Sequence, residues 1–286
     1  MRIYDVMVIG AGPAGIGAAL QLRHNGFNPI VIERDRIGGR IRLARRVENL
    51  ISSKPLTGSQ VVKILRDMVD RKGIEVRFEN VLKIQGSKDL YCIRTNINSY
   101  FARFIIIATG LKPVIPDIVG IDRLERNNLL FLEWETLNKR SHSPVLIIGG
   151  GEVGADSACS LRERGFEVAL FSRSKNLEIN PILKRDIKRL GVITITGISY
   201  KEIEMDKKVV LLKYIRGGKE FIASGRSILL TAGGNPSLSF LNKDVDKSRI
   251  IICGDANLIN AHQAAIAFGD GVNAAMKISR LILKKE

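Results

Sequence analysis

Cysteine is scarce in this sequence, whose 286 residues include only Cys92, Cys159 and Cys253. These positions are far apart, so the chain has neither a CxxC pair nor the ligand spacing of a zinc site. The pattern excludes a disulfide framework, and we expect no metal centre. A sparse and odd number of cysteines is typical of a reducing compartment, where we expect packed thiols.

Long apolar runs and a leader sequence are also missing. No run reaches the ~18 residues that cross a bilayer, and the N-terminus enters an apolar strand pattern without the layout of a signal peptide. Hydrophobic residues make up 45% and charged residues 26% of the chain, as in ordinary globular proteins. We therefore expect a cytoplasmic protein of one large or two medium domains, without a membrane span.

Acidic residues are few: 29 Asp and Glu stand against 45 Lys and Arg, which gives a net charge of +16. Such a charge favours an acidic partner, which could be a nucleic acid, an anionic surface or an acidic protein. The basic residues are spread along the chain without aromatic interleaving, so we do not expect nucleic-acid binding. A solvated basic surface and a dedicated binding patch both remain open.

The most informative stretch is Tyr4–Glu33, YDVMVIGAGPAGIGAALQLRHNGFNPIVIE. An apolar run, a glycine turn, a helix-like segment and a second apolar run that ends in an acid follow one another, which is the dinucleotide-binding fingerprint. Gly10 allows the tight turn, Gly12 lets the backbone approach a pyrophosphate, and Gly15 permits close packing of helix and strand. The helix N-terminus favours phosphate binding, and Glu33 can accept hydrogen bonds from ribose hydroxyls.

The same pattern returns at a constant offset of 139 residues, where Gly149, Gly151 and Gly154 repeat the three glycines. Ser172 falls where the first copy has Glu33. An internal repeat on this scale means two nucleotide-binding folds and is more informative than either motif alone.

The segments between and after the two copies indicate the domain organisation. Residues 111–116 carry two prolines and are typical of an interdomain crossing. A predicted strand at 250–256 and a long predicted helix at 261–283 return the chain to the first domain. We therefore predict an α/β fold of two Rossmann-like three-layer nucleotide-binding domains, with a domain at 113–244 inserted into a discontinuous domain at 1–112 and 245–286.

A series of short motifs runs through the whole chain: GAGPAG at 10–15, GGRI at 38–41, VENL at 47–50, LTG at 56–58, ATG at 108–110, GGGEVG at 149–154, AGGNP at 232–236 and CGDA at 253–256. In combination and in this order they resemble the thioredoxin-reductase-like group of two-domain flavoproteins. The resemblance implies FAD in the discontinuous domain and NAD(P)H in the inserted one. It also implies a homodimer, as in many members of the group.

The resemblance assigns site residues to each cofactor. The implied FAD contacts are Gly10, Gly12, Pro13, Ala14, Gly15, Glu33, Arg34, Gly39, Arg40, Asn49, Thr109, Gly110, Gly254, Asp255, Gln263 and Ala264. The implied NAD(P)H contacts are Gly149, Gly151, Glu152, Val153, Ser172, Arg173, Ala232 and Gly233. Asp255, at the end of a strand, would bind a ribityl hydroxyl. A helix from about His262 would point its N-terminus at the flavin pyrimidine ring, where the dipole stabilises reduced flavin.

One departure from the group concerns the redox disulfide. Thioredoxin reductases carry a CxxC shortly before the second glycine motif, and here Leu132-Glu133-Trp134-Glu135 stands in that place. Dithiol exchange needs a thiolate and a resolving thiol, so we expect no catalytic residue of that kind and no thioredoxin reduction by the group's mechanism. Trp134 is either a buried aromatic or a cover for the flavin.

The choice of nicotinamide depends on the end of the second strand in the second copy. NAD-specific sites usually hold an acid there, whereas this chain has Ser172 followed by Arg173 and, further on, Lys175. A guanidinium suits a 2′-phosphate because it binds phosphate in a bidentate way. This pattern favours NADPH, with NADH as the alternative.

These observations predict an FAD-dependent NAD(P)H oxidoreductase in which hydride passes to the flavin and electrons leave to a non-dithiol acceptor. The more specific hypothesis is that the acceptor is a ferredoxin, because a protein with a net charge of +16 attracts acidic electron carriers. Reductases of that kind usually carry a further C-terminal segment over the flavin, whereas this sequence ends at Glu286. Oxygen, a quinone or a small disulfide stays open, and the alternative is a non-catalytic FAD-binding protein or an electron-transfer subunit whose partner chain supplies the thiols.

Overall fold

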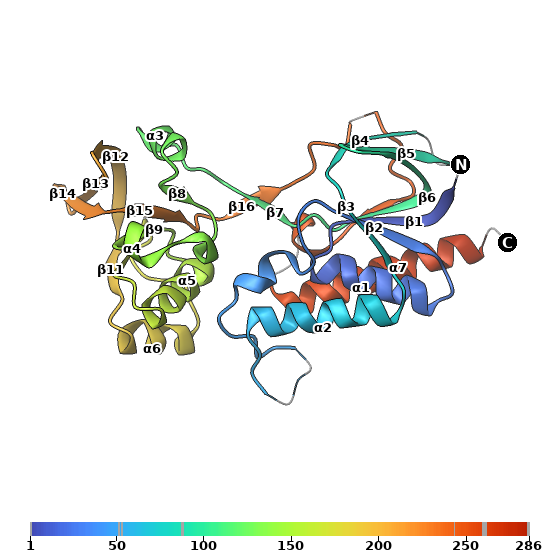
Figure 1. Cartoon of the computed structure of the whole chain (residues 1–286), viewed down its shortest axis with the longest axis horizontal. Helices are drawn as coiled ribbons and strands as arrows, with labels where there is room; N and C mark the ends of the chain where they lie inside the picture. The colour runs from blue at the N-terminus through green and yellow to red at the C-terminus, as the bar shows by residue number, and fades with distance from the viewer. Residues whose placement is uncertain are drawn as a thin grey trace. The chain divides into compact units, whose positions relative to one another are not determined.

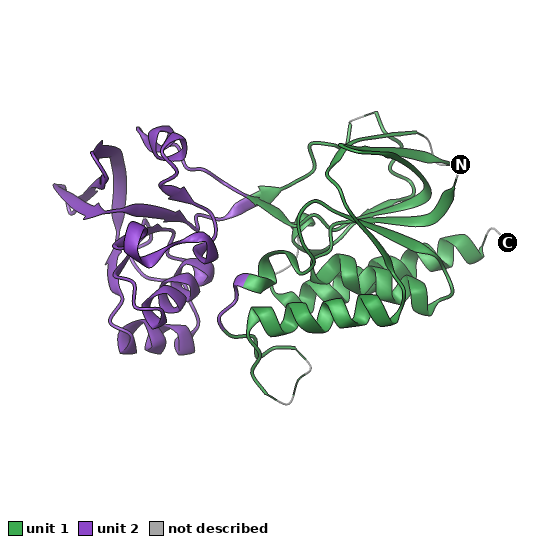
Figure 2. Ribbon diagram, viewed as in Figure 1, with its two compact units in different colours: residues 1–42, 46–112, 235–286 green, residues 43–45, 113–234 purple. Residues whose placement is uncertain are grey.

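The computed structural model describes residues 2–50, 52, 54–86, 89–242, 244–258 and 262–284, which form two compact units. Unit 1 comprises Met1–Arg42, Arg46–Lys112 and Asn235–Glu286, and unit 2 comprises Leu43–Arg45 and Pro113–Gly234 (Figure 2). Unit 2 is thus inserted into unit 1, and the chain returns at Asn235, earlier than the expected 245. No helix in the described ranges is long and apolar enough to cross a membrane.

The sheet of unit 1 has the strand order β3-β2-β1-β6-β5-β4, and β17 also pairs with β6. Its parallel strands are β1 (Ile3–Ile9), β2 (Pro29–Glu33), β3 (Glu75–Phe78), β6 (Ser99–Ile107) and β17 (Ile250–Ile252). β4 (Val81–Gly86) and β5 (Tyr91–Thr95) continue it in antiparallel pairing. The apolar ends of β1 and β6 are buried on both faces, as is usual for parallel strands covered on both sides.

Helices α1 (Pro13–His24), α2 (Gly58–Arg71) and α7 (Ala264–Leu283) lie together on one face of this sheet (Figure 1). A Cβ built on Gly271 would lie 1.8 Å from the carbonyl oxygen of Ala14, so only glycine lets α7 approach α1 this closely. On the other face a core of buried side chains includes Met7, Ile93 and Phe240. η1 (Gly39–Leu43) and η3 (Gly254–Ala256) are short 3₁₀ helices whose first glycines lie against Gly12 and Ala14 of the glycine turn.

Unit 2 contains a parallel sheet of order β11-β10-β9-β15-β8. Its strands are β8 (Leu130–Phe131), β9 (Val145–Ile148), β10 (Val168–Ser172), β11 (Ile193–Thr196) and β15 (Ser227–Leu230). Helices α5 (Glu152–Glu163) and α6 (Pro181–Arg189) pack on one face through Leu161 and Leu183. An antiparallel sheet of β12 (Ile198–Asp206), β13 (Val209–Arg216) and β14 (Lys219–Gly225) packs on the other face, which gives three layers (Figure 1).

The short elements of the chain lie at its connections. They are α3 (Ile121–Arg126), η2 (Trp134–Thr136), α4 (Lys139–His142) and the paired strands β7 (Leu111–Pro113) and β16 (Gly234–Pro236). Two expected boundaries differ from the structure. The strand expected at 250–256 ends at Ile252 and continues as η3, and the described part of the last helix begins at Ala264, while its expected start at 261 lies outside the described residues.

Candidate nucleotide-binding sites

The first glycine turn joins β1 to α1, and its backbone admits only glycine at two positions. Gly10 has φ +105°, and a Cβ built on it would lie 2.4 Å from the carbonyl oxygen of Ala108. A Cβ on Gly15 would lie 1.8 Å from the carbonyl oxygen of Gly10. These contacts explain why the turn needs both glycines.

Gly12 faces open space instead. A Cβ built on it would meet no atom of the described chain within 4 Å. Gly12 is the N-cap of α1, and no described side chain accepts a hydrogen bond from the first turn of the helix there. Free N–H groups at a helix N-terminus form an anion site, so the turn has the shape and the donors that a pyrophosphate requires.

Glu33 fastens the end of β2 to this turn. Its Oε2 accepts a hydrogen bond from the backbone N–H of Ala11 at 2.7 Å, and its Oε1 accepts one from Asp35 at 2.9 Å. The N–H of Gly38 donates to the carbonyl oxygen of Ala11 at 2.8 Å, so the next loop also lies against the turn. A carboxylate can accept about four hydrogen bonds, so Glu33 keeps acceptor capacity for ribose hydroxyls.

The other residues expected at FAD lie in the same unit. Gly39 borders the turn, with its Cβ position 3.4 Å from the Cα of Gly12. Pro13 and Ala14 begin α1, and Arg34 and Arg40 are exposed beside β2 and in η1. The hydroxyl of Thr109 donates to the carbonyl oxygen of Ser237 at 3.0 Å, and Gly110 follows with φ +62°.

Two segments that are distant in sequence meet near the start of α7. The side-chain amide of Asn49 donates to Oε1 of Gln263 at 2.8 Å, and Gln263 is the N-cap that precedes Ala264. Asp255 lies 3.4 Å from Nδ1 of His262, and the N–H of Gly254 donates to Asp270 at 2.8 Å. The described helix α7 begins at Ala264, directly after these contacts.

The second glycine turn repeats the first one in unit 2. Gly149 has φ +126°, and its Cβ position lies 2.6 Å from the backbone of Thr231. The Cβ position of Gly154 lies 1.9 Å from the carbonyl oxygen of Gly149. Gly151 caps α5 with φ −80° and ψ −177°, close to the −73° and −177° of Gly12. Two segments related only by an internal repeat thus adopt one backbone geometry.

The strand ends of the two units differ. Ser172 is only 5% exposed, and a Cβ built on Gly150 would lie 2.5 Å from its Oγ. The Ser172 side chain therefore fills the room that Gly150 leaves free, and Arg173 is the exposed group at this end. Lys175 is also exposed and lies beside Gly197. The predicted pair of Ser172 and Arg173 is thus divided into one buried and one exposed side chain.

The remaining residues expected at NAD(P)H surround the same turn. Glu152 and Val153 open α5 and are exposed, and Oε1 of Glu152 accepts a hydrogen bond from Asn180 at 3.1 Å. Ala232 and Gly233 follow β15, and Gly233 has φ +89°. All of these residues belong to unit 2.

The segment that replaces the redox disulfide is packed into unit 2. Trp134 is 6% exposed, its Nε1 donates to the carbonyl oxygen of Leu43 at 2.9 Å, and the guanidinium of Arg164 lies 4.1 Å from the ring centroid. The hydrogen bond holds the edge of the indole, and the cation–π contact with Arg164 covers one face of it. Trp134 is therefore the buried aromatic that was one of the two expected alternatives.

The thiols are suited to packing. Cys159 and Cys253 are buried, Cys92 is partly exposed, and all three are free. Burial raises the pKa of the Cys159 thiol to about 11 and that of Cys253 to about 12. Because the thiolate is the reactive form, neither buried cysteine is activated for disulfide exchange.

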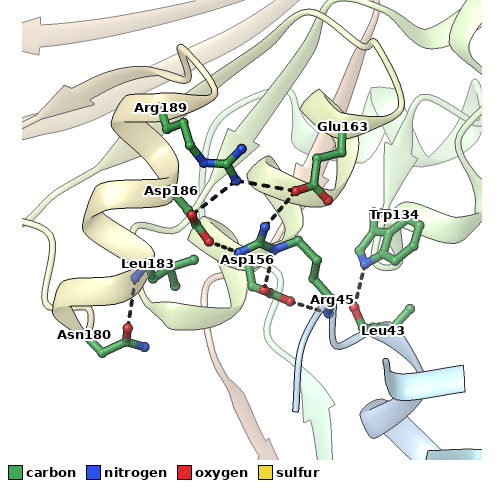
Figure 3. A network of polar contacts seen from close by, with 9 residues as sticks. All are labelled: Leu43, Arg45, Trp134, Asp156, Glu163, Asn180, Leu183, Asp186 and Arg189. Atoms are coloured by element: carbon green, nitrogen blue, oxygen red, sulfur yellow. Dashed lines mark hydrogen bonds and ion pairs between the residues drawn. The ribbon is translucent and has the colours of Figure 1, made fainter. Parts of the chain in front are cut away.

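An ion-pair network in unit 2 has no counterpart in the sequence-based expectations (Figure 3). Leu43–Arg45 pack with unit 2, although the residues on both sides of them belong to unit 1. The Arg45 guanidinium donates to Glu163 at 2.8 Å and to Asp186, and its backbone N–H donates to Asp156 at 2.9 Å. Burial alone would raise the pKa of Asp186, but the hydrogen bond and the positive charge of Arg45 lower it. At Asp156 the effect of burial is larger than that of Arg45, so the pKa of Asp156 is raised.

Two parallel-sheet units that each carry a glycine turn at a helix N-terminus define a two-domain nucleotide-binding protein. The chain belongs to the pyridine nucleotide-disulphide oxidoreductase family, whose sequence model matches residues 4–273. It is therefore a member of a family of flavin-dependent oxidoreductases, and family membership implies FAD and NAD(P)H.

Curated relatives share about a quarter of their residues with this chain. Mercuric reductase from Staphylococcus aureus is 24% identical over 84% of this chain and 50% of its own length. The F subunit of alkyl hydroperoxide reductase in Staphylococcus epidermidis is 25% identical over 98% of this chain and 59% of its own length. The chain thus spans about half the length of these relatives.

Solved structures share the fold over the whole chain. Thioredoxin reductase from T. acidophilum superposes with a TM-score of 0.88 and 26% identity, covering 99% of this chain and 100% of that one. Bacillithiol disulfide reductase from Staphylococcus aureus superposes with a TM-score of 0.82 and 20% identity, covering 100% of both chains. The predicted fold class and the resemblance to thioredoxin reductases are confirmed.

Proposed function

We propose that this chain is an FAD-dependent NAD(P)H oxidoreductase that passes electrons to an acceptor other than a protein dithiol. The observation that carries the proposal is the packing of Trp134 in place of the family's redox disulfide. The raised pKa values of Cys159 and Cys253 support it, because protonated thiols do not attack disulfides.

The residues of unit 1 fit FAD, which supplies the redox chemistry when bound. The open face at Gly12 and the free N–H groups of α1 would hold the pyrophosphate. Glu33, already fixed by Ala11, would accept the adenosine ribose hydroxyls. Asp255 would hold the ribityl chain, and the N-terminus of α7 would stabilise negative charge on the pyrimidine ring. The other residues named for FAD above would complete this site.

The residues of unit 2 fit a nicotinamide dinucleotide, and we infer a preference for NADPH. Gly151 and the N-terminus of α5 would bind the pyrophosphate as Gly12 and α1 do in unit 1. An acid that would select the 2′-hydroxyl of NADH is replaced by the buried Ser172. Arg173 is exposed beside it and would bind the 2′-phosphate. NADH remains the alternative reductant.

The acceptor that the charge favours is an acidic protein such as a ferredoxin. The net charge of +16 would speed the encounter with such a carrier. We also infer a homodimer, on the sequence resemblance alone, and a cytoplasmic location, on the sparse and odd number of cysteines. The second candidate function is an electron-transfer subunit whose partner chain supplies thiols. It is favoured by the match to the F subunit of alkyl hydroperoxide reductase, of which this chain covers 59%.

An acceptor panel tests the proposal. The purified protein is reduced with NADPH under anaerobic conditions and mixed with ferredoxin, a quinone, oxygen, a small disulfide or thioredoxin. We expect bound flavin and turnover with a non-dithiol acceptor. Thioredoxin reduction that disappears in Cys253→Ser would contradict the proposal, and so would a purified protein that cannot bind flavin.

A further inference from the structure

The carbonyl group that anchors the second glycine turn accepts a further hydrogen bond from a side chain. Among the described residues, the corresponding carbonyl at the first turn accepts no side-chain hydrogen bond. In unit 1 the N–H of Gly10 donates to the carbonyl oxygen of Ile32 at 2.8 Å, which ties the turn to β2. In unit 2 the N–H of Gly149 donates to the corresponding carbonyl oxygen, that of Phe171, at 3.0 Å. The hydroxyl of Tyr200 donates to this same oxygen, also at 3.0 Å. One carbonyl group therefore joins the glycine turn, the end of β10 and a side chain of β12.

Two opposing effects act on the pKa of the Tyr200 hydroxyl. Burial raises the pKa of the Tyr200 hydroxyl, and the positive charge of Arg173 partly offsets this effect. The hydroxyl therefore stays protonated at neutral pH and remains a hydrogen-bond donor to Phe171.

The segment that carries Arg173 is held on both sides, by Tyr200 in β12 and by Gly197 just before that strand. On one side Tyr200 bonds the carbonyl of Phe171, and on the other the N–H of Gly197 donates to the carbonyl of Ser174 at 3.0 Å. Only Ser172 and Arg173 lie between these two anchored residues. Gly197 has φ +67°, a conformation that favours glycine at this anchor.

We propose that Tyr200 is a positioning residue for recognition of the 2′-phosphate of NADPH: it fixes the end of β10 so that Arg173 is presented to that phosphate. The inference rests on the proposed use of unit 2 for a nicotinamide dinucleotide. It adds a residue outside the glycine motif and outside the strand end to the determinants of nucleotide choice. Because the glycine turn keeps its own hydrogen bond from Gly149 to Phe171 when the Tyr200 hydroxyl is lost, we expect Tyr200 to affect binding of the 2′-phosphate and not of the rest of the nucleotide.

Calorimetric titration with two small ligands tests this role without flavin chemistry. Adenosine 2′,5′-bisphosphate and adenosine 5′-monophosphate differ only in the 2′-phosphate. We expect the intact protein to bind the bisphosphate more tightly. In Tyr200→Phe the Kd for the bisphosphate should rise about fivefold, the effect of one lost neutral hydrogen bond, while the Kd for the monophosphate should not change.

Two further variants make the result specific. Tyr214→Phe removes a hydroxyl from the ring that packs edge-on against Phe171, at 5.6 Å between centroids, and should leave both Kd values unchanged. In an Arg173→Ala background, Tyr200→Phe should have no further effect on the bisphosphate, because coupled residues are not additive. Equal weakening of both ligands by Tyr200→Phe, or an unchanged ratio of the two Kd values, would overturn the proposal.

The titration also separates this inference from the proposed function. An intact protein without preference for the bisphosphate would overturn the role of Tyr200, while oxidation of NADH by the flavoprotein could still be observed. Failure of the proposed function would show in the flavin content and the acceptor panel instead.

Discussion

The glycine turns of the two units have similar backbone conformations but differ in the side chain that packs against each turn from the end of the neighbouring strand. At Gly10 and Gly149 the left-handed conformation and the close approach of a neighbouring strand are the same. In unit 1 the Glu33 carboxylate binds the N–H of Ala11, whereas in unit 2 Ser172 packs against Gly150. The comparison teaches that the two turns offer the same backbone N–H groups, while the strand ends offer different side chains; under the proposed function the turn binds pyrophosphate and the strand end selects the ribose.

The largest expected effect comes from adding a methyl group to the third glycine of either turn. In Gly15→Ala or Gly154→Ala the new Cβ would overlap a carbonyl oxygen at 1.8 or 1.9 Å. Each change should destabilise its own unit by about 3 kcal/mol. We expect Gly15→Ala to lose bound flavin, and Gly154→Ala to keep flavin that NAD(P)H no longer reduces, as measured by absorbance of the purified variants.

The matched control is Gly269→Ala in α7, where a built Cβ meets no described atom within 4 Å. It should retain flavin and gain up to about 1 kcal/mol from helix propensity. If Gly154→Ala released the flavin and Gly15→Ala kept it, the two nucleotides would be assigned to the wrong units.

Arg45→Ala should produce the next largest effect, and it should act on unit 2 alone. The substitution leaves the partly buried Asp156 and Asp186 without their shared cation, which should cost about 2 kcal/mol because partial exposure reduces the penalty of a buried pair. Hydrogen exchange should rise in α5 and α6 and stay unchanged in α1. Arg46→Ala, which breaks only the exposed pair with Glu48, should not alter exchange in α5 or α6. Equal loosening of α1 and α5 by Arg45→Ala would refute its assignment to unit 2.

Two mild substitutions test the two strand ends separately. Glu33→Gln removes the negative charge that holds the N–H of Ala11, which should weaken FAD binding by about 1.5 kcal/mol, roughly tenfold. Ser172→Ala removes a hydroxyl packed against Gly150 and should change the Kd for NADPH by less than about twofold. The Kd values come from fluorescence titration. A tenfold loss in Ser172→Ala would mean that the serine contacts the nucleotide.

The smallest effect concerns acid stability of unit 1. Burial alone would raise the pKa of Glu79, but hydrogen bonds from Thr95, Tyr100 and Asn98 outweigh it and lower the pKa. Because the folded-state pKa is below the unfolded value of 4.5, the stabilisation is present above that pH and is lost as the pH falls through the folded value. Glu79→Gln should cost about 1 kcal/mol at neutral pH and flatten the fall of stability in acid. Urea unfolding across this pH range measures it, and an unchanged acid slope would argue against Glu79.

The glycine turns could be predicted from the sequence because their backbone geometry allows only glycine at four positions. Gly10, Gly15, Gly149 and Gly154 each meet a carbonyl group or a left-handed conformation that excludes a side chain. The repeat and the parallel sheets followed from these residues and from the apolar runs beside them.

Features that depend on long-range packing could not be predicted. The bond between Asn49 and Gln263 and the Arg45 network join residues that no local pattern relates. The strand β12 was missed because a bulge between Tyr200 and Glu202 shifts its alternation of apolar and polar residues by one position. The burial of Ser172 depends on the missing side chain of Gly150, a position that the motif leaves variable.

The central claim is that, without an added acceptor, electrons from NAD(P)H stay on the flavin, because the sequence carries no CxxC pair to receive them. Anaerobic titration of the flavoprotein with NADPH tests this most directly, since each NADPH delivers two electrons and a flavin accepts two. We predict complete bleaching at about one NADPH per flavin, with NADPH more effective than NADH, and the same end point after replacement of all three cysteines by serine. An end point near two NADPH per flavin that falls to one in the cysteine-free protein would reveal a hidden dithiol and contradict the account.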